Sequence, residues 1–218
     1  MKRFLPFLII GAVALTAVGG AVTYYRAKRP AAVAVSAEAA KAVAGEPHTR
    51  GGAEAKVTLE EFGDFQCPPC GVLFETLEPL EKKYGQRLRV IFRQYPLASH
   101  THAMEAALAA EAAGFQGRFW EMHDMLYRKR ADWIGATEAG TIFHQYAATL
   151  GLNLEQFEKD AKGSAARTRI AADEKRAKDL SVALTPTVYW NNQAMPFEKL
   201  APASLPKMID EAMVDKAP

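Results

Sequence analysis

The sequence predicts an α/β domain with an all-helical insertion, preceded by an N-terminal membrane-spanning helix. Residues 56–95 follow a strand, helix, strand order, which is typical of a βαβ unit with parallel strands. From Thr101 the apolar residues recur at helical spacing for about 80 residues, and strand character returns at Thr187. Helices that cluster in one block, instead of alternating with strands, indicate an insertion packed on an α/β core.

The chain begins with an apolar run from Phe4 to Tyr25, after a short basic head. At about 1.5 Å per residue, a helix over this run spans about 33 Å, enough to cross the hydrocarbon core of a bilayer. The alternative is a cleaved signal peptide, with the small residues at 19–21 as the cleavage site. The run is long for a signal peptide, so residues 1–29 are interpreted as an uncleaved signal anchor. Either interpretation exports the rest of the chain.

Residues 30–52 are rich in alanine, contain proline and glycine, and hold no aromatic residue. This composition cannot bury a core, so we expect a flexible linker that separates a domain from the membrane. The remaining residues, 53–218, suit a single domain.

The first half of that domain is expected to contain a strand over 56–62, a helix over 69–84 and a strand over 88–95. Pro79 is expected to kink the helix and Gly85 to end it. The apolar face of this helix is predicted to consist of Val72, Leu73, Leu77 and Leu80.

The insertion is expected to cover residues 100–180 approximately. Asn153, followed by Gln156, is typical of a capping box at a helix start. The last helix of the block, 164–180, is dense in charge, and such a run is usually a solvated face. A β-hairpin over 187–195 and an amphipathic helix over 204–214 complete the predicted domain.

The two cysteines of the chain, Cys67 and Cys70, stand three positions apart at the start of the predicted helix. On a first helical turn their Cβ atoms lie roughly 5–6 Å apart, close to disulfide distance. Free N–H groups and the helix dipole favour a thiolate at this position. The pair therefore indicates a redox dithiol, in which Cys67 is exposed and nucleophilic and Cys70 resolves the mixed disulfide.

Two other interpretations of this pair remain. Half of a zinc site is disfavoured because such sites usually take four protein ligands, and the chain has no second CxxC. A purely structural disulfide is disfavoured because so short a loop removes little entropy from the unfolded chain. His100 and His102 are more typical of an exposed helix start than of a metal site, so no metal is assigned.

The order of these motifs resembles the DsbA family of thioredoxin-fold thiol:disulfide oxidoreductases. The motifs are Phe-x-Cys-Pro-x-Cys at a helix start, a helical insertion, and Thr185-Pro186 before a hairpin. The resemblance covers residues 56–214 and implies a thioredoxin-like fold. It also implies that Pro186 is a cis-proline lying against the Cys67–Cys70 disulfide, which agrees with the modest cost of a cis X–Pro bond.

The resemblance further implies how a substrate binds. Thr185 would offer backbone hydrogen bonds to a substrate peptide, and Pro68 and Pro69 are assigned to the same binding surface. Glu61 stands where thioredoxin-like proteins carry a buried acid beneath the dithiol. There, desolvation would raise its pKa and allow proton exchange with Cys70. Alternatively, strand alternation turns Glu61 outward and buries Glu60.

One departure from the family pattern bears on the direction of electron flow. Well-known oxidases of the family carry histidine before the second cysteine, where this chain has Pro69. Proline supplies neither a charge nor an N–H group. A strongly lowered pKa of Cys67, and with it a strongly oxidising dithiol, is therefore not predicted by the motif.

We expect an enzyme, a protein-disulfide oxidoreductase whose only redox group is the Cys67–Cys70 disulfide, with no further cofactor. The preferred function is an oxidase for exported, cysteine-containing proteins, recharged by a membrane redox partner that is DsbB-like or vitamin K epoxide reductase-like. The alternatives are a membrane-tethered reductase or isomerase, and a non-enzymatic thioredoxin-fold binding module. We expect a monomer on the periplasmic side of the membrane, anchored or released by signal cleavage, with no nucleic-acid partner.

Overall fold

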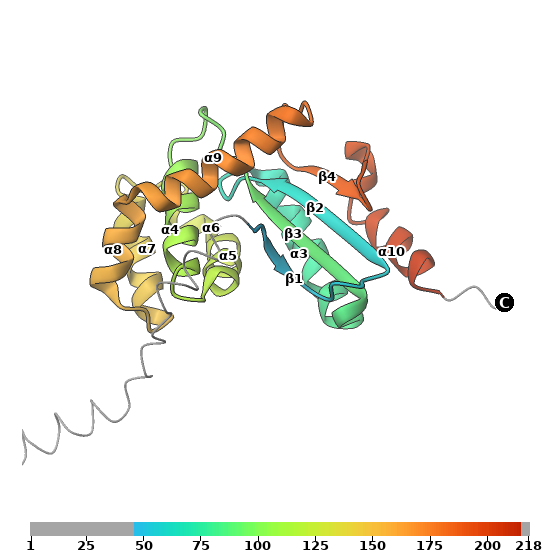
Figure 1. The fold of residues 1–218 in the computed structure, drawn as a ribbon, viewed down its shortest axis with the longest axis horizontal. Coiled ribbons are helices and arrows are strands. Elements are labelled where there is room, and N and C mark those ends of the chain that lie inside the picture. Colours follow the sequence, from blue (N-terminus) through green and yellow to red (C-terminus); the bar gives the residue numbers. More distant parts are fainter. Residues whose placement is uncertain (1–45, 215–218) are drawn as a thin grey trace, which may run out of the picture. The chain divides into compact units, whose positions relative to one another are not determined.

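The structure, a computed structural model, describes residues 46–214, which form one five-stranded sheet with helices on both faces (Figure 1). The strand order is β1-β3-β2-β4-β5, in which β2 and β3 are parallel and the other neighbours are antiparallel. The strands are β1 His48–Arg50, β2 Val57–Gly63, β3 Leu88–Gln94, β4 Thr187–Trp190 and β5 Gln193–Ala194. The predicted α/β class is therefore confirmed.

The predicted βαβ unit is present, with helix α3 (Pro68–Tyr84) between the two parallel strands. The short 3-10 helix η1 (Gly85–Arg87) follows it. α3 continues through Pro79 and ends at Gly85, whose φ of 50° is in the left-handed region that favours glycine. Val72, predicted to lie on the apolar face of α3, is instead 47% exposed.

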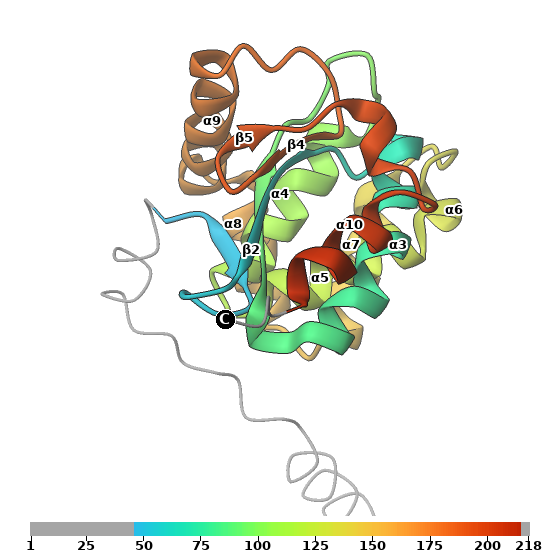
Figure 2. The same ribbon diagram turned by 90° about the vertical axis from the view of Figure 1, so that its right-hand side faces the viewer.

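Each face of the sheet has its own helical cover. α3 and the C-terminal helix α10 (Leu205–Met213) pack on one face, and Figure 2 shows them side by side. The buried side chains of this layer include Leu59, Leu73, Leu77, Leu205 and Ile209. On the opposite face, Phe62 packs with Ala177 and Val182 at the end of helix α9. The domain is thus a three-layer sandwich around the sheet.

The predicted helical insertion is also present. Its helices are α4 Ala103–Gly114, α5 Phe119–Arg128, α6 Arg130–Trp133, α7 Ala139–Thr149, α8 Leu154–Lys162 and α9 Ser164–Asp179. Asn153 caps α8, because its Oδ1 accepts from the Gln156 backbone N–H at 2.9 Å. The Gln156 side chain bonds Asp160 instead of returning to the cap (2.8 Å), so only half of the capping box forms.

The linker predicted over 30–52 ends earlier than expected. Residues 48–50 form strand β1, which pairs with β3 in the register His48↔Phe92. The Trp120 indole N–H donates to the Thr49 carbonyl oxygen (3.2 Å), and the His48 ring stacks on Phe119. These contacts tie the segment to the insertion, so the folded domain begins before residue 53.

The charge-rich helix α9 is solvated on one face, as its sequence predicts, but its opposite face buries charged side chains. Its Arg169 is buried and donates to Glu111 on α4, with Nε and Oε2 2.6 Å apart. Glu111 is 1% exposed and also accepts from Gln94 (3.0 Å), and its Oε2 lies 2.9 Å from His48 Nε2. This buried carboxylate therefore joins strands β1 and β3 to two helices of the insertion.

A second charged cluster joins the other half of α9 to the sheet. Glu60 accepts from Arg176 (Nε to Oε1, 2.6 Å) and from Arg93 (Nε to Oε1, 2.8 Å). Arg93 also donates to Asp173 of α9 at 2.9 Å. Burial raises the pKa of Glu60, but the two arginines outweigh it and the net pKa is lowered. Glu60 is thus buried as a paired carboxylate on the face of the sheet opposite α3.

The signal anchor predicted over 1–29 and most of the linker lie outside the residues that the structure describes. Among residues 46–214, no helix is both long and apolar enough to cross a membrane.

Candidate active site

The dithiol lies at the junction of β2 and α3, as the motif predicts. Cys67 is the N-cap of α3, with an extended backbone (φ −69°, ψ 123°), and Pro68 follows it in the first turn. A proline fits this turn because its missing N–H group has no helical acceptor there. The Cys67 N–H donates to the Asp64 carbonyl oxygen (3.1 Å), which fixes the bend between strand and helix. The two cysteines are reduced and free of a disulfide bond.

The Thr185–Pro186 loop lies directly against this helix start. The peptide bond between the two residues is cis, as the family resemblance implies. The Cys67 thiol donates to the Thr185 carbonyl oxygen across 3.3 Å, although the two residues are 118 positions apart in the sequence. The structure therefore brings together Cys67, Cys70, Thr185 and Pro186.

Cys70 is more deeply buried than Cys67, as predicted. Cys67, however, was expected to be exposed and is itself buried. It is 4% exposed, and Cys70 is fully buried. The exposed residues beside them are Pro68 and Pro69, together with Leu184, which is 53% exposed. The cause is the Thr185–Pro186 loop, which covers Cys67 and leaves the surrounding apolar residues as the accessible surface.

The pKa of Cys67 is lowered to about 6. The largest cause is a hydrogen bond from the Cys70 thiol; burial opposes it, and the Thr185 side chain and the Cys70 backbone N–H support it. The bond that Cys67 donates to the Thr185 carbonyl is lost on ionisation. The Thr185 hydroxyl, which is buried without a hydrogen-bond partner, is then available to donate to the thiolate. The missing histidine at position 69 is thus replaced by neutral donors.

The pKa of Cys70 is shifted in the opposite direction to that of Cys67. Its burial raises the pKa of the thiol well above 9, and the bond to Cys67 and the charge of Glu61 raise it further. At neutral pH the thiolate therefore sits on Cys67 and the proton on Cys70. This separation matches the predicted roles of an attacked and a resolving sulfur, which remain predictions.

Glu61 and Glu60 are both buried, so Glu61 is not turned outward as the second alternative from the sequence expected. Glu61 is 4% exposed, and its Oε1 has no hydrogen-bond partner. Burial raises the pKa of Glu61 to about 8, the charge of Glu81 adds to this, and Arg50 opposes it. The Glu61 carboxyl is therefore the acid that lies behind the dithiol, and Glu60 is held by arginines on the other face.

Arg50, whose charge opposes the raised pKa of Glu61, joins α3 to the insertion. Its Nη2 lies 2.8 Å from Glu81 Oε2 on α3, and its Nη1 lies 2.9 Å from Asp124 Oδ1 on α5. The sequence placed Arg50 in the linker and therefore missed it. No local pattern indicates its role, because both partners are distant in the sequence.

Two further residues that sequence reasoning missed, Asp64 and Arg130, fix the loop before Cys67. The fully buried Asp64 side chain accepts from the Gln66 N–H (2.7 Å) and the Leu97 N–H (2.9 Å), and lies 2.7 Å from His100 Nδ1. Arg130 of α6 donates to the Gln66 carbonyl oxygen. The insertion thus clamps the dithiol loop from outside.

His102 differs from its predicted place at an exposed helix start. It is 8% exposed, and its Nε2 lies 2.8 Å from the Ala136 carbonyl oxygen. Its backbone N–H donates to Gln66 Oε1 (2.7 Å), which adds a second contact to the dithiol loop. Over residues 46–214, no three His, Cys, Asp or Glu side chains are grouped so as to hold a metal ion.

A buried dithiol beside a cis-proline, with one sulfur ionised and the other protonated, defines a protein-disulfide oxidoreductase. The chain belongs to the thioredoxin family, because the family model described as Thioredoxin matches residues 43–211. Its structure combines a thioredoxin-like fold with a DsbA-like helical insertion.

Solved structures with this fold include BdbD from Bacillus subtilis in the oxidised form. It is 21% identical to this chain, with a TM-score of 0.63, and the match covers 77% of this chain and 96% of that one. A thioredoxin-like oxidoreductase from Silicibacter pomeroyi is 25% identical, with a TM-score of 0.61, and the match covers 76% and 91% of the two chains.

Among curated proteins, a Na(+)/H(+) antiporter NhaA 1 from Salinispora arenicola is 40% identical over 147 residues. This match covers 67% of the present chain and 22% of the antiporter. The chain thus spans less than a quarter of the length of the first curated relatives that it matches.

Proposed function

We propose that this protein is a disulfide oxidase that passes the Cys67–Cys70 disulfide to cysteine-containing exported proteins. The observation that carries the proposal is the opposite electrostatics of the two sulfurs, with the pKa of Cys67 lowered to about 6 and that of Cys70 raised. A stabilised Cys67 thiolate stabilises the reduced protein, and a dithiol that is stable when reduced is a better oxidant.

The reaction starts with a substrate thiolate attacking Cys67 Sγ of the oxidised protein. The Cys67–Cys70 bond breaks, a substrate–Cys67 disulfide forms, and Cys70 leaves as a thiolate that takes up a proton. A second substrate thiolate then attacks the substrate sulfur of the mixed disulfide, and Cys67 leaves as a thiolate. Two electrons pass from the substrate pair, which becomes a disulfide, to the protein, which becomes a dithiol.

Glu61 is the proposed proton donor to the departing Cys70. Because its pKa is raised to about 8, the carboxyl is mostly protonated at neutral pH. In support of this role, the charge of Glu61 raises the pKa of Cys70. Donation to the Cys70 thiolate avoids leaving a bare anion in the core, where desolvation is costly.

The proposed substrate surface surrounds the Cys67 sulfur. Pro68, Pro69 and Leu184 are exposed beside it and offer apolar contacts without a sequence requirement. Thr185 presents its backbone groups next to the sulfur, where an extended peptide can bond to them. This combination suits a range of unfolded exported chains better than one small molecule.

The reduction potential tests the direction of the reaction. Lowering the pKa of Cys67 from 9 to about 6 stabilises the reduced form about tenfold at pH 7, which is about 30 mV for a two-electron couple. We therefore expect equilibration with glutathione to give a potential above the value of about −270 mV for thioredoxin. A potential at or below that value would favour the reductase alternative. A thiol that does not react would favour the alternative of a structural disulfide.

The location of the enzyme is proposed from residues outside those that the structure describes. The apolar run from Phe4 to Tyr25 is proposed to anchor the domain to the outer face of the cytoplasmic membrane, where a DsbB-like or vitamin K epoxide reductase-like partner reoxidises it. The full chain should remain in carbonate-washed membranes; a soluble product that starts near Val22 would show a signal peptide. Antiport is not proposed, because the match covers about a quarter of those transporters.

A further inference from the structure

Tyr127 places a phenol behind the dithiol, although it belongs to insertion helix α5. Its ring stacks on Phe74, with the centroids 5.2 Å apart and the planes 18° apart, and lies 5.0 Å from Phe65. Phe74 follows Cys70 by four residues and so shares its face of α3. Phe65 precedes Cys67 by two residues. Rings on both sides of the motif thus fix the position of Tyr127.

The hydroxyl of Tyr127 is buried and has no hydrogen-bond partner. Tyr127 as a whole is only 5% exposed. Buried hydroxyls in proteins are nearly always hydrogen-bonded, because an unmet donor keeps its full desolvation cost. Glu61 Oε1, in the same region, is a buried oxygen that also lacks a partner. Both residues interact electrostatically with Cys70, so two unmet polar atoms lie within electrostatic range of one sulfur.

The charged groups that act on the Tyr127 hydroxyl are carboxyls and thiols. Burial raises the pKa of Tyr127 well above 10, and the charges of Cys70, Glu61, Asp64 and Cys67 raise it further. His123, whose ring centroid is 5.0 Å from that of Tyr127, is held neutral because burial lowers its pKa to about 4. The phenol therefore stays protonated and acts as a donor.

We propose that the Tyr127 hydroxyl donates a hydrogen bond to whichever of Cys70 and Glu61 carries the negative charge during disulfide exchange. Tyr127 is thus a positioning residue for proton transfer, and it is supplied by the insertion. The inference rests on the proposed function, because it requires that Cys70 form a thiolate. It also gives the insertion a part in the chemistry besides holding the dithiol loop in place.

The step in question is the closure of the protein disulfide. Reduced protein attacks oxidised glutathione through Cys67, which forms a Cys67–glutathione disulfide and releases one glutathione thiolate. In molecules whose Glu61 carboxyl is ionised, Cys70 then loses its proton to Glu61 and attacks Cys67 Sγ. The Cys67–Cys70 bond forms, and the second glutathione leaves with the electron pair. Tyr127 stabilises the anion on Cys70 or Glu61 in this second stage alone.

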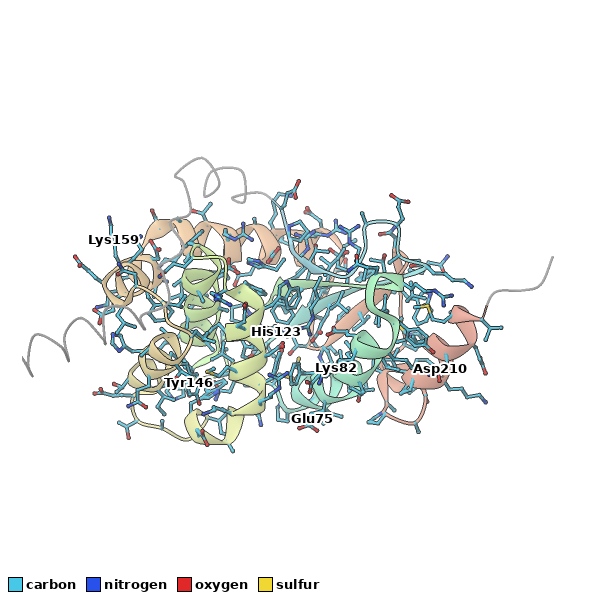
Figure 3. The ribbon with its side chains drawn as sticks, turned by 90° about the horizontal axis from the view of Figure 1, so that it is seen from below. Glu75, Lys82, His123, Tyr146, Lys159 and Asp210 are labelled. Carbon is cyan, nitrogen blue, oxygen red and sulfur yellow. The ribbon has the colours of Figure 1, made fainter. Side chains whose placement is uncertain are left out.

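The test compares Tyr127→Phe with the matched control Tyr146→Phe in the full-length chain. Tyr146 belongs to the same buried cluster but lies on α7, among the insertion helices, as Figure 3 shows. Its hydroxyl faces the Lys129 carbonyl oxygen (3.5 Å). Reduced protein is mixed with oxidised glutathione, quenched with acid at intervals over a range of pH, and the glutathione-bound fraction is measured by mass spectrometry.

For Tyr127→Phe we expect the first stage to be unchanged and the second to slow about tenfold at pH 7, so that the mixed disulfide accumulates. The midpoint of the second-stage pH profile should move up by about one unit, since loss of a donor to an anion raises the pKa of that group. Tyr146→Phe should leave both the rate and the midpoint unchanged.

Unchanged rate and midpoint in Tyr127→Phe would overturn the inference. Equal slowing in Tyr146→Phe would also overturn it, because the effect would then come from packing alone. Failure of the proposed function has a different signature, in which the unsubstituted protein itself forms neither the mixed disulfide nor the closed one. Thermal unfolding of both variants should match that of the unsubstituted protein, which separates the chemical effect from a loss of fold.

Discussion

Replacing Cys67 with serine is expected to reduce disulfide exchange to the uncatalysed rate. Serine keeps the size of the side chain at this N-cap but cannot form a disulfide or offer a thiolate of lowered pKa. The measurement is the oxidation of a dithiol peptide by oxidised glutathione with catalytic amounts of each protein. A Cys67→Ser variant that keeps the rate of the unsubstituted protein would show that another group carries the reaction.

The pH dependence of the unsubstituted protein checks the same assignment. Because the pKa of Cys67 is lowered to about 6, its alkylation by iodoacetamide should rise as the pH passes through about 6 and then level off. Cys70 should stay unmodified at neutral pH, because burial raises its pKa well above 9. Faster alkylation of Cys70 would reverse the two roles.

Glu111→Gln is expected to lower the free energy of unfolding by about 3 kcal/mol, the low end for breaking a buried ion pair. Glutamine keeps the shape and one acceptor, but it removes the carboxylate charge that Arg169 Nε meets at 2.6 Å. Chemical denaturation at pH 7 measures the change. For a domain of this size, the melting temperature should fall by about 6–12 °C.

The matched control is Glu75→Gln, because Glu75 lies exposed on α3 (Figure 3) and should change the stability by less than about 0.5 kcal/mol. Burial raises the pKa of Glu111, but His48, Arg169 and Gln94 outweigh it and the net pKa is lowered. The stabilisation is therefore present above the unfolded value, about 4.5, and is lost as the pH falls through the folded value. A stability gap between Glu111→Gln and the unsubstituted protein that persists unchanged in acid would contradict this account.

The sequence predicts correctly those parts of the fold that depend on local patterns. The βαβ unit, the helical insertion and the hairpin after Pro186 each follow from periodicity or turn residues within one segment. Strand β1 has no such pattern, because three residues are too few to show alternation. Its place in the sheet depends on β3, some forty residues later.

Buried charge is the other feature that the sequence hides. A run such as α9 is usually solvated, and its Arg169 becomes buried only because Glu111 and Glu46 lie across from it, 58 and 123 positions away. The same holds for the arginine pairs of Glu60. Composition predicts that α9 carries charge, but only tertiary pairing decides which of its charges are desolvated.

The residues of the site also fall into those that a local motif predicts and those that only tertiary packing brings to the dithiol. Cys67, Cys70 and Pro186 are predictable because a motif with a known mechanism contains them. Tyr127 and Arg130 are not, because they lie on helices of the insertion and reach the dithiol only through packing. The exposure of Cys67 was predicted wrongly, since the motif does not reveal that the Thr185–Pro186 loop covers it.

The most direct test of the central claim is the capture of substrate on one particular sulfur. Cys70→Ser and Cys67→Ser variants, expressed with the exported proteins of the cell, are compared after acid quenching by non-reducing gels and mass spectrometry. The account predicts that Cys70→Ser holds a ladder of mixed disulfides through Cys67, because no resolving thiol is left, and that Cys67→Ser holds almost none. Mixed disulfides mapped to Cys70, or none in either variant, would contradict it.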